Sequence, residues 1–496
     1  MRLSVVMAGV SLGALSFALP SLAHAQQAAA SAPTIAQMEQ QILQLTHEVQ
    51  VLKAQQTVTP KSVDETAGVK KLPDATIRRN EGILNLDGIT LYGTVDVGVS
   101  YLNHGAPLST DYGPGLPYVI QKYSHRSTTS LAENGMGQSR IGLTGLEPIT
   151  KDISVLFKLE TGFQPLSGTI ANGPKSLVAN NGVALNRQVT SGDSSRAGQA
   201  FEGAAYGGVA SKTFGTVIFG RQNSLVLDNL AKYDPQALSQ AFSPLGYSGL
   251  AGGGGLTESA RFDSSLKYAY AYGPAHFAAL HQFGSAGGIP GGADQVDLGL
   301  DKGGLSVDAT YTHVSDAVSE GSLTAAQNIA APGTLTATIS DNTAFALQGK
   351  YAWKRLKLYA GYEYITFANP RSPVAVGTTG MGGYVLSVVN NTAYTNHRIQ
   401  QVSWFGARYS LTPSLDIVGA YYRYDQNSYK GNGCANVSFS SCSGNLQDYS
   451  LVADYRLTKR FDVYAGVNAS SVANGMASGY EETSAVATTT GARFSF

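Results

Sequence analysis

The last residues of the chain, 488–496, alternate between two kinds of side chain. Phe494 and Phe496 point to one side of an extended strand, and Arg493 and Ser495 point to the other, because side chains in a strand alternate with period 2. A soluble domain rarely leaves two Phe at its terminus without a core to cover them. A strand with lipid on one face and water on the other uses both faces, provided that it pairs with another strand. The C-terminus therefore predicts the closing strand of a membrane β-barrel.

The N-terminus predicts export. Arg2 precedes an apolar stretch at residues 3–19, and the small-x-small sequence 23–25 offers a cleavage site before Gln26. We interpret residues 1–25 as a secretory signal peptide, with a membrane anchor as the alternative. No later segment supplies the roughly 18 consecutive apolar residues of a membrane helix. Any further crossing of a membrane must therefore use strands.

The composition agrees with an exported β-barrel. The chain has 34 basic and 34 acidic residues, and removal of Arg2 with the signal leaves 33 against 34. This balance excludes a strong nucleic-acid footprint. Only 14% of residues are charged, whereas there are 27 Tyr and 57 Gly, which is typical of barrels and unusual for helical soluble proteins.

The cysteines predict a disulfide, whereas the histidines predict no metal site. Cys434 and Cys442 lie eight residues apart in a polar segment, so a disulfide is expected after export. The eight His are scattered without Cys or carboxylate neighbours at metal-ligand spacing, so no metal and no cofactor are predicted. The glycine run 252–255 has no strand-to-helix context for phosphate binding and is interpreted as a loop.

A heptad pattern occupies residues 35–52. Apolar residues recur with spacings of 3, 4, 3, 4 and 3 at Ile35, Met38, Ile42, Leu45, Val49 and Leu52. We predict a periplasmic coiled coil within residues 26–60, and a lone amphipathic helix is the alternative. The a and d residue types favour a dimer, whereas a trimeric barrel would impose a trimer. Residues 61–87 are interpreted as a linker.

Residues 88–496 carry the barrel pattern. Residues 89–101 alternate almost without interruption, which suits a tilted membrane strand. Seven short turns are predicted within residues 147–152, 211–215, 273–275, 301–304, 353–355, 411–414 and 457–460. They join fourteen strands, and the opening and closing strands make sixteen. The long segments between pairs, such as 102–137, 164–198, 223–260 and 367–397, are expected to be extracellular. A barrel of 16–18 strands leaves an aqueous channel, whereas eight strands are filled by their own side chains.

Several short stretches share their order and spacing with one protein family. They are residues 91–96, 139–145, 157–163, 199–203, 214–222 and 261–268. Together they resemble the Gram-negative general porins, the trimeric diffusion porins. The resemblance implies an outer-membrane homotrimer in contact with outer-membrane lipid, which lets small hydrophilic solutes and ions diffuse passively. It also implies that the barrel-assembly machinery reads the strand ending in Phe496.

The resemblance also implies a constriction. In the family, a long loop folds inward and faces a ladder of arginines, and here that loop would be residues 223–260. The side chains carried over as pore-lining residues are Arg140, Arg221 and Arg261, with Arg196 and Lys267 as further bases and Asp228, Asp234 and Glu258 as counter-charges. The alternative for each arginine is an ordinary solvated charge. The middle of the loop lacks the family's usual acidic cluster, which predicts weak selectivity tilted toward anions.

Strand alternation predicts different directions for two of these arginines. Arg140 lies opposite the apolar Ile141 and Leu143, as a lumen residue should. Arg221 shares its parity with Val217 and Phe219, so it reaches the lumen only if the strand ends or bulges at Gly220.

Two other functions remain as alternatives. An outer-membrane barrel enzyme, such as a lipid hydrolase, would need a Ser/His pair on the outer wall and usually has fewer strands. A trimeric adhesin would explain the coiled coil, but it contributes few strands per chain. Sixteen strands in one chain favour a porin.

Overall fold

The computed structural model describes residues 84–86, 88–104, 125–170, 175–183, 200–247, 260–284, 291–379, 383–430, 435–436, 441–478 and 480–496. The expected signal peptide and coiled-coil segment lie outside these residues, as does nearly all of the expected linker. Within that linker, β1 (Leu84–Leu86) pairs with the start of the first barrel strand.

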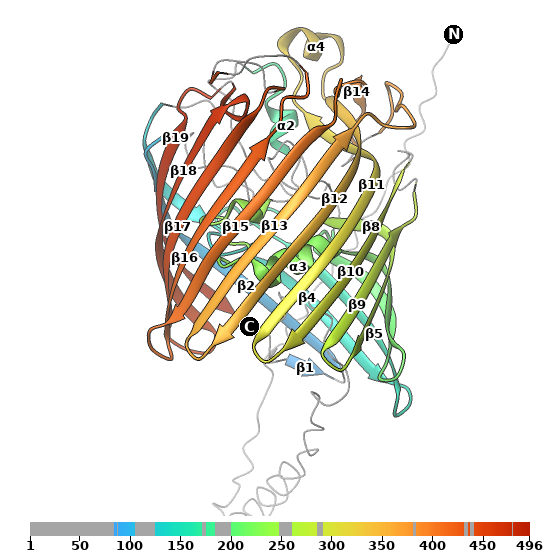
Figure 1. The fold of residues 1–496 in the computed structure, drawn as a ribbon, viewed down its shortest axis with the longest axis vertical. Coiled ribbons are helices and arrows are strands. Elements are labelled where there is room, and N and C mark those ends of the chain that lie inside the picture. Colours follow the sequence, from blue (N-terminus) through green and yellow to red (C-terminus); the bar gives the residue numbers. More distant parts are fainter. Residues whose placement is uncertain are drawn as a thin grey trace, which may run out of the picture. The chain divides into compact units, whose positions relative to one another are not determined.

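In the described part of the chain, sixteen antiparallel strands close into a barrel, as predicted (Figure 1). They are β2 (Ile89–Leu102), β4 (Arg140–Pro148), β5 (Ile153–Gly162), β6 (Ala204–Ser211), β7 (Gly215–Asn223), β8 (Arg261–Tyr272), β9 (Ala275–Gln282), β10 (Gly292–Lys302), β11 (Leu305–Gly321), β12 (Leu335–Trp353), β13 (Leu356–Ala368), β15 (Arg398–Ser410), β16 (Leu415–Gln426), β17 (Gly444–Arg456), β18 (Phe461–Asn474) and β19 (Ser484–Ser495). The seven predicted short turns are confirmed, because each joins two consecutive strands of this set.

The C-terminal strand closes the barrel against the first one. β19 runs antiparallel to β2, from Ala487 opposite Leu102 to Ser495 opposite Thr94. Phe496 and Gly93 then exchange two backbone hydrogen bonds of 2.9 and 3.0 Å. The predicted parity is confirmed, since Phe494 is exposed on the outer face and Arg493 turns inward to Asp462.

The strands are apolar outside and polar inside. In β10, Val296 and Leu298 are 40% and 59% exposed, whereas Gln295 and Asp297 between them are 1% and 2% exposed. A soluble protein has the reverse pattern. An exposed apolar face around a closed sheet is stable only where lipid covers it. Membrane β-barrels have this arrangement, with an apolar outer band and a polar interior.

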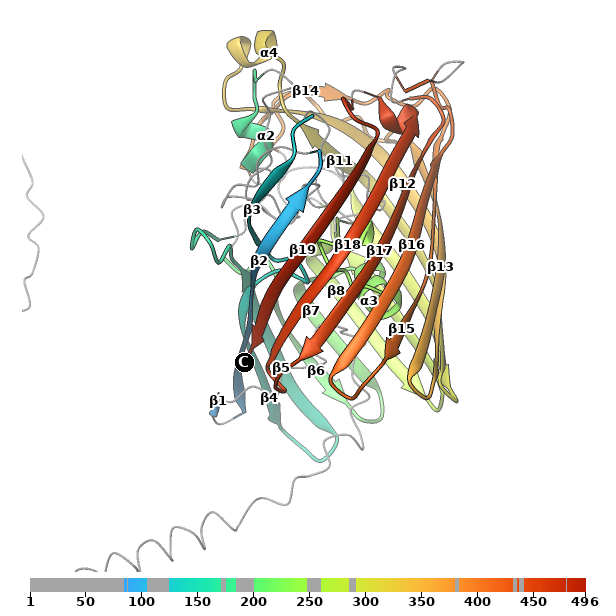
Figure 2. The same cartoon turned by 90° about the vertical axis from the view of Figure 1, so that its left-hand side faces the viewer.

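Additional elements gather at the end of the barrel opposite the short turns (Figures 1 and 2). They are the strands β3 (Thr128–Glu133) and β14 (Leu386–Asn390) and the helices α2 (Lys175–Ala179) and α4 (Ala325–Ala330). β3 pairs with the second half of β2 and β4 with its first half, so the expected loop 102–137 contains a strand. Among the described residues, no helix is long and apolar enough to span a membrane.

One long segment lies inside the barrel instead of at its rim. It contains α3 (Leu225–Tyr233) and a 3₁₀ turn (Pro244–Tyr247), and both views show α3 behind the strands of the wall (Figures 1 and 2). Val226, Leu230 and Leu245 are buried against Trp404 and Tyr422 of the opposite wall. The inner core therefore lies between this segment, called the inner loop below (residues 224–247), and the lumen wall.

Candidate pore constriction

The inner loop begins with a capped helix. Ser224 is the N-cap of α3 and accepts a hydrogen bond of 3.0 Å from Leu227 N, which satisfies one of the free amides of the first turn. Inside the helix, Asp228 Oδ2 lies 2.8 Å from Lys267 Nζ of β8. At the end of the helix, Trp404 of β15 donates its Nε1–H to Tyr233 O over 3.1 Å. The helix is therefore bound to two different parts of the wall.

Asp234 holds the turn that follows α3. Its carboxylate accepts hydrogen bonds from the backbone N–H of Gln236 and Leu238 and from the Tyr422 hydroxyl of β16. Burial raises the pKa of the Asp234 carboxyl, and the bond from Tyr422 opposes that shift. With 2% exposure, Asp234 fixes the loop and does not face the channel water.

The inner loop then reaches the backbone between β3 and β4 and the inner face of β18. Ala241 N and Ser239 Oγ donate to Gly135 O over 2.9 and 2.8 Å. Phe242 packs edge-on against Tyr464 of β18, with ring centroids 6.3 Å apart. The loop thus contacts β8, β15, β16 and β18 in turn, and crosses the lumen in doing so.

Arg140 lies among charged residues on the inner face of β4 and β5. Its Nε lies 3.7 Å from Glu160 Oε2, and Lys158 Nζ lies 3.5 Å from the same oxygen. Tyr92 also donates its hydroxyl proton to Glu160 over 2.8 Å. Among the described residues, two bases therefore lie beside the same carboxylate in this part of the wall.

Arg221 reaches the interior through a bulge. The register between β7 and β8 shifts between Gly220 and Gln222, and Gly220 has φ +124, a conformation that favours glycine. Arg221 is consequently 8% exposed, in contrast to the exposed Phe219 two residues earlier. Its guanidinium donates to Glu202 O over 2.9 Å and pairs with Asp263 at 2.5 Å. The bulge that Arg221 needs in order to reach the interior is therefore present at Gly220.

Arg261 completes the group. Its Nε donates to Gly203 O over 2.7 Å, and it forms no ion pair with any residue that the structure describes. A Cβ on Gly203 would overlap the Glu160 carboxylate, so only glycine allows this approach. The segment Glu202–Gly203 therefore connects all three predicted arginines, since Arg221 and Arg261 bind its carbonyls and Arg140 binds the carboxylate packed on it.

The structure places the other predicted residues differently. Lys267 and Asp228 pair with each other, with side chains 4% and 11% exposed, so neither presents a free charge to the channel. Arg196, Glu258 and Cys434 lie outside the described residues, and the predicted disulfide stays a prediction. Cys442 is described and buried.

Three charged partners were missed by sequence reasoning. Lys158, Glu160 and Asp263 occur in stretches that carry the family resemblance, but they are not among the predicted site residues. Strand alternation indicates an inward direction for two of them, since Lys158 and Glu160 lie on the opposite face of β5 from Phe157 and Leu159. Asp263 had no such signal, because it lies at the register shift.

Comparisons with known proteins agree with this architecture. The family model described as Gram-negative porin matches residues 74–474. An outer membrane porin protein of Bordetella pertussis is 24% identical over 391 residues, which cover 76% of this chain and 87% of that protein.

Solved structures share the fold. The anion-selective porin from Comamonas acidovorans aligns with a TM-score of 0.51 and 16% identity, over 82% of this chain and 99% of that chain. The outer-membrane expressed OmpT of Vibrio cholerae aligns with a TM-score of 0.50 and 14% identity, over 84% of this chain and 100% of that chain. With a family model matched over most of its length and a closed barrel, the chain is an outer-membrane channel and belongs to the Gram-negative porin family.

Proposed function

We propose that this porin forms a water-filled channel for small hydrophilic solutes and ions, weakly selective and tilted toward anions. The observation that carries the proposal is the surplus of positive charge around Glu202–Gly203. The likeness to an anion-selective porin concerns the fold alone at 16% identity, so the tilt rests on the charges of this chain.

Counted over the residues that the structure describes, the charges around this segment sum to about one positive unit. Four bases face three acids: Arg140, Lys158, Arg221 and Arg261 against Glu160, Glu202 and Asp263. Fixed charges in a narrow channel act more strongly than in bulk water, so even a small surplus shifts ion permeability. Because the surplus is small, the selectivity should be weak.

The inner loop supplies little negative charge in return. Asp228 is neutralised by Lys267, and Asp234 is buried against Tyr422. The rest of the described loop, residues 235–247, contains no acidic residue. Among the described residues of the loop, little negative charge therefore opposes the arginine side.

Reversal potentials in a planar bilayer test the proposal. Under a salt gradient, Arg140→Ala with Arg261→Ala should move the zero-current potential toward cation preference. The matched control removes the same net charge from an exposed turn, with Lys459→Ala and Arg460→Ala, and should leave the potential close to that of the wild type. A wild-type channel with strong cation selectivity, or equal shifts in both variants, would contradict the proposed tilt.

The assembly and the terminal segments complete the proposal. We infer a homotrimer, whose insertion by the barrel-assembly machinery depends on the strand ending in Phe496. Residues 1–25 act as the signal peptide, residues 26–60 form a periplasmic coiled coil, and Cys434 bonds to Cys442 in an extracellular loop. Cross-linking and native mass measurements of the full mature chain, and of a chain without residues 26–60, test whether the trimer needs the coiled coil.

A further inference from the structure

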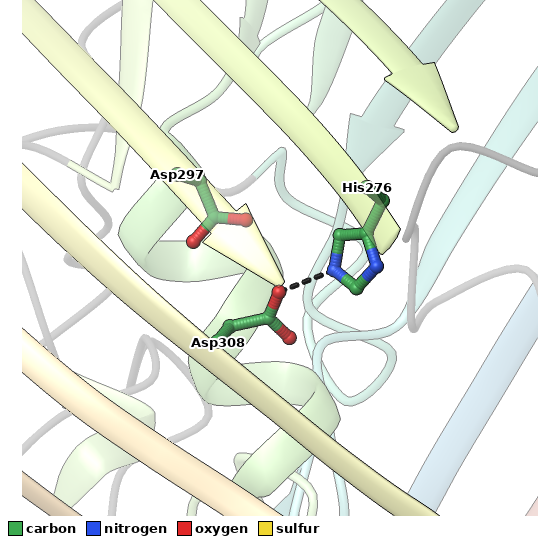
Figure 3. Close-up of side chains that lie close together, drawn as sticks. All are labelled: His276, Asp297 and Asp308. Carbon is green, nitrogen blue, oxygen red and sulfur yellow. Dashed lines mark hydrogen bonds and ion pairs between the residues drawn. The ribbon is translucent and has the colours of Figure 1, made fainter. Parts of the chain in front are cut away.

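Three neighbouring strands place possible metal ligands side by side on the inner wall beside α3. His276 of β9, Asp297 of β10 and Asp308 of β11 each offer a ligand atom, and these atoms lie within 4.8 Å of one another (Figure 3). Their sequence spacing gave no sign of this, because the site forms only when the three strands pair. Asp297 and Asp308 are 2% and 0% exposed.

Glycine makes the meeting of these side chains possible. Gly299 of β10 lies between His276 and Asp308 in the register of the three strands. A Cβ at this position would overlap both His276 Nε2 and Asp308 Oδ1. The missing side chain lets donor atoms from β9 and β11 meet across β10, where they form a hydrogen bond (Figure 3).

The charges around the cluster are unbalanced. Lys232 Nζ of α3 lies 2.8 Å from Asp308 Oδ2 and 3.5 Å from Asp301 Oδ1. Asp297 accepts hydrogen bonds from two neutral donors, Asn229 Nδ2 at 2.6 Å and Thr310 Oγ1 at 2.8 Å. Three carboxylates thus face one lysine and one imidazole. Two buried carboxylates this close repel each other unless a proton or a cation lies between them.

We propose that His276, Asp297 and Asp308 bind a divalent transition metal of the Zn²⁺ class beside helix α3 of the inner loop. One imidazole nitrogen with carboxylate oxygens suits Zn²⁺, whereas Mg²⁺ and Ca²⁺ prefer all-oxygen sites. Lys232 binds Asp308 through Oδ2, and His276 binds Oδ1. The metal would replace this hydrogen bond between His276 and Oδ1, while Lys232 stays in place. The metal would bridge three wall strands beside α3.

Calorimetric titration of the full folded chain in detergent tests this, with ZnCl₂ as ligand and MgCl₂ as the comparison. His276→Ala should weaken one Zn²⁺ site at least about tenfold, a loss in the range seen when metal-site groups are removed. The matched control is His281→Ala. His281 Nδ1 lies 2.8 Å from Asp294 Oδ1 in the same two strands, but on the exposed outer face, so this variant should bind Zn²⁺ like the wild type.

Asp297→Asn provides the second variant, because it keeps the size of the side chain and an oxygen for Asn229 and Thr310. Circular dichroism establishes that each variant retains the barrel, and if His276→Ala does not fold, Asp297→Asn decides. Loss of the site in the inner-wall variants with retention in His281→Ala supports the proposal. Wild-type Zn²⁺ binding in the inner-wall variants, equal loss in His281→Ala, or equal binding of Mg²⁺ would overturn it.

Discussion

Removal of Lys267 should release the inner loop from the wall. Lys267→Met deletes the ammonium that lies 2.8 Å from Asp228 and leaves that carboxylate buried, with its side chain 11% exposed. Removing one partner of a buried pair costs about 3–5 kcal/mol, because the other charge stays desolvated. Asn223 still donates to Asp228 over 2.9 Å, so we expect the lower end of this range. At about 1.4 kcal/mol per factor of ten, the released fraction should rise about a hundredfold.

Trypsin reports this release directly. Lys232 lies inside α3 with its side chain 9% exposed, so cleavage after it requires the loop to detach. When opening and closing are fast, the cleavage rate follows the open population. Mass spectrometry of timed digests should show the fragment that ends at Lys232 appearing about a hundredfold faster in Lys267→Met than in the wild type. Cleavage after exposed basic residues of the described turns, such as Lys459, serves as the internal reference.

Two further variants complete the comparison. Lys267→Met with Asp228→Asn removes both charges, and should recover most of the wild-type protection because no buried charge is left unpaired. Lys302→Met, at an exposed turn, should cleave like the wild type. If Lys267→Met digests at the wild-type rate, or if the double variant digests as fast as the single one, the ion pair does not hold the loop.

Two other expectations concern packing and pH. Gly361→Ala should destabilise the barrel by about 1–3 kcal/mol in thermal unfolding, since a Cβ there would overlap the Trp404 ring, whereas Gly419→Ala meets nothing closer than 3.9 Å and should be nearly neutral. The Glu482 hydrogen bond raises the pKa of His125 above 6.5, and that bond in turn lowers the pKa of Glu482 below 4.5. The stabilisation from His125 is therefore complete below pH 6.5 and disappears as the pH rises through its raised pKa, while that from Glu482 is present above pH 4.5 and disappears as the pH falls through its lowered pKa. An NMR titration should give a His125 pKa above 6.5 that returns toward this value in Glu482→Gln, and an unchanged value in that variant would contradict the assignment.

The barrel itself could be predicted because its signals are local. Period-2 alternation decides which side chains face lipid and which face water, and this holds for Arg493 and Phe494 as soon as the strand forms. Turn residues mark where strands end, so the seven short turns and the sixteen strands followed from the sequence. Arg140 also followed, since its inward direction depends only on the parity of its own strand.

The partners of the site residues depended on the tertiary structure. Lys267 and Asp228 are predicted to line the pore, and the structure pairs them with each other because the inner loop places α3 against β8. No local pattern encodes this contact, which depends on how far a long loop enters the lumen. Burial then decides the outcome, since a charge removed from water must find a partner.

The sequence thus shows which residues are charged, but the tertiary structure determines which residues pair with them. His276, Asp297 and Asp308 are scattered along the chain, and only the register of three strands, with Gly299 between two of them, brings their ligand atoms together. Arg221 needed a register shift at Gly220 to reach the interior. Alternation acts between neighbours along one strand, whereas pairing and burial act between strands that meet only when the barrel closes.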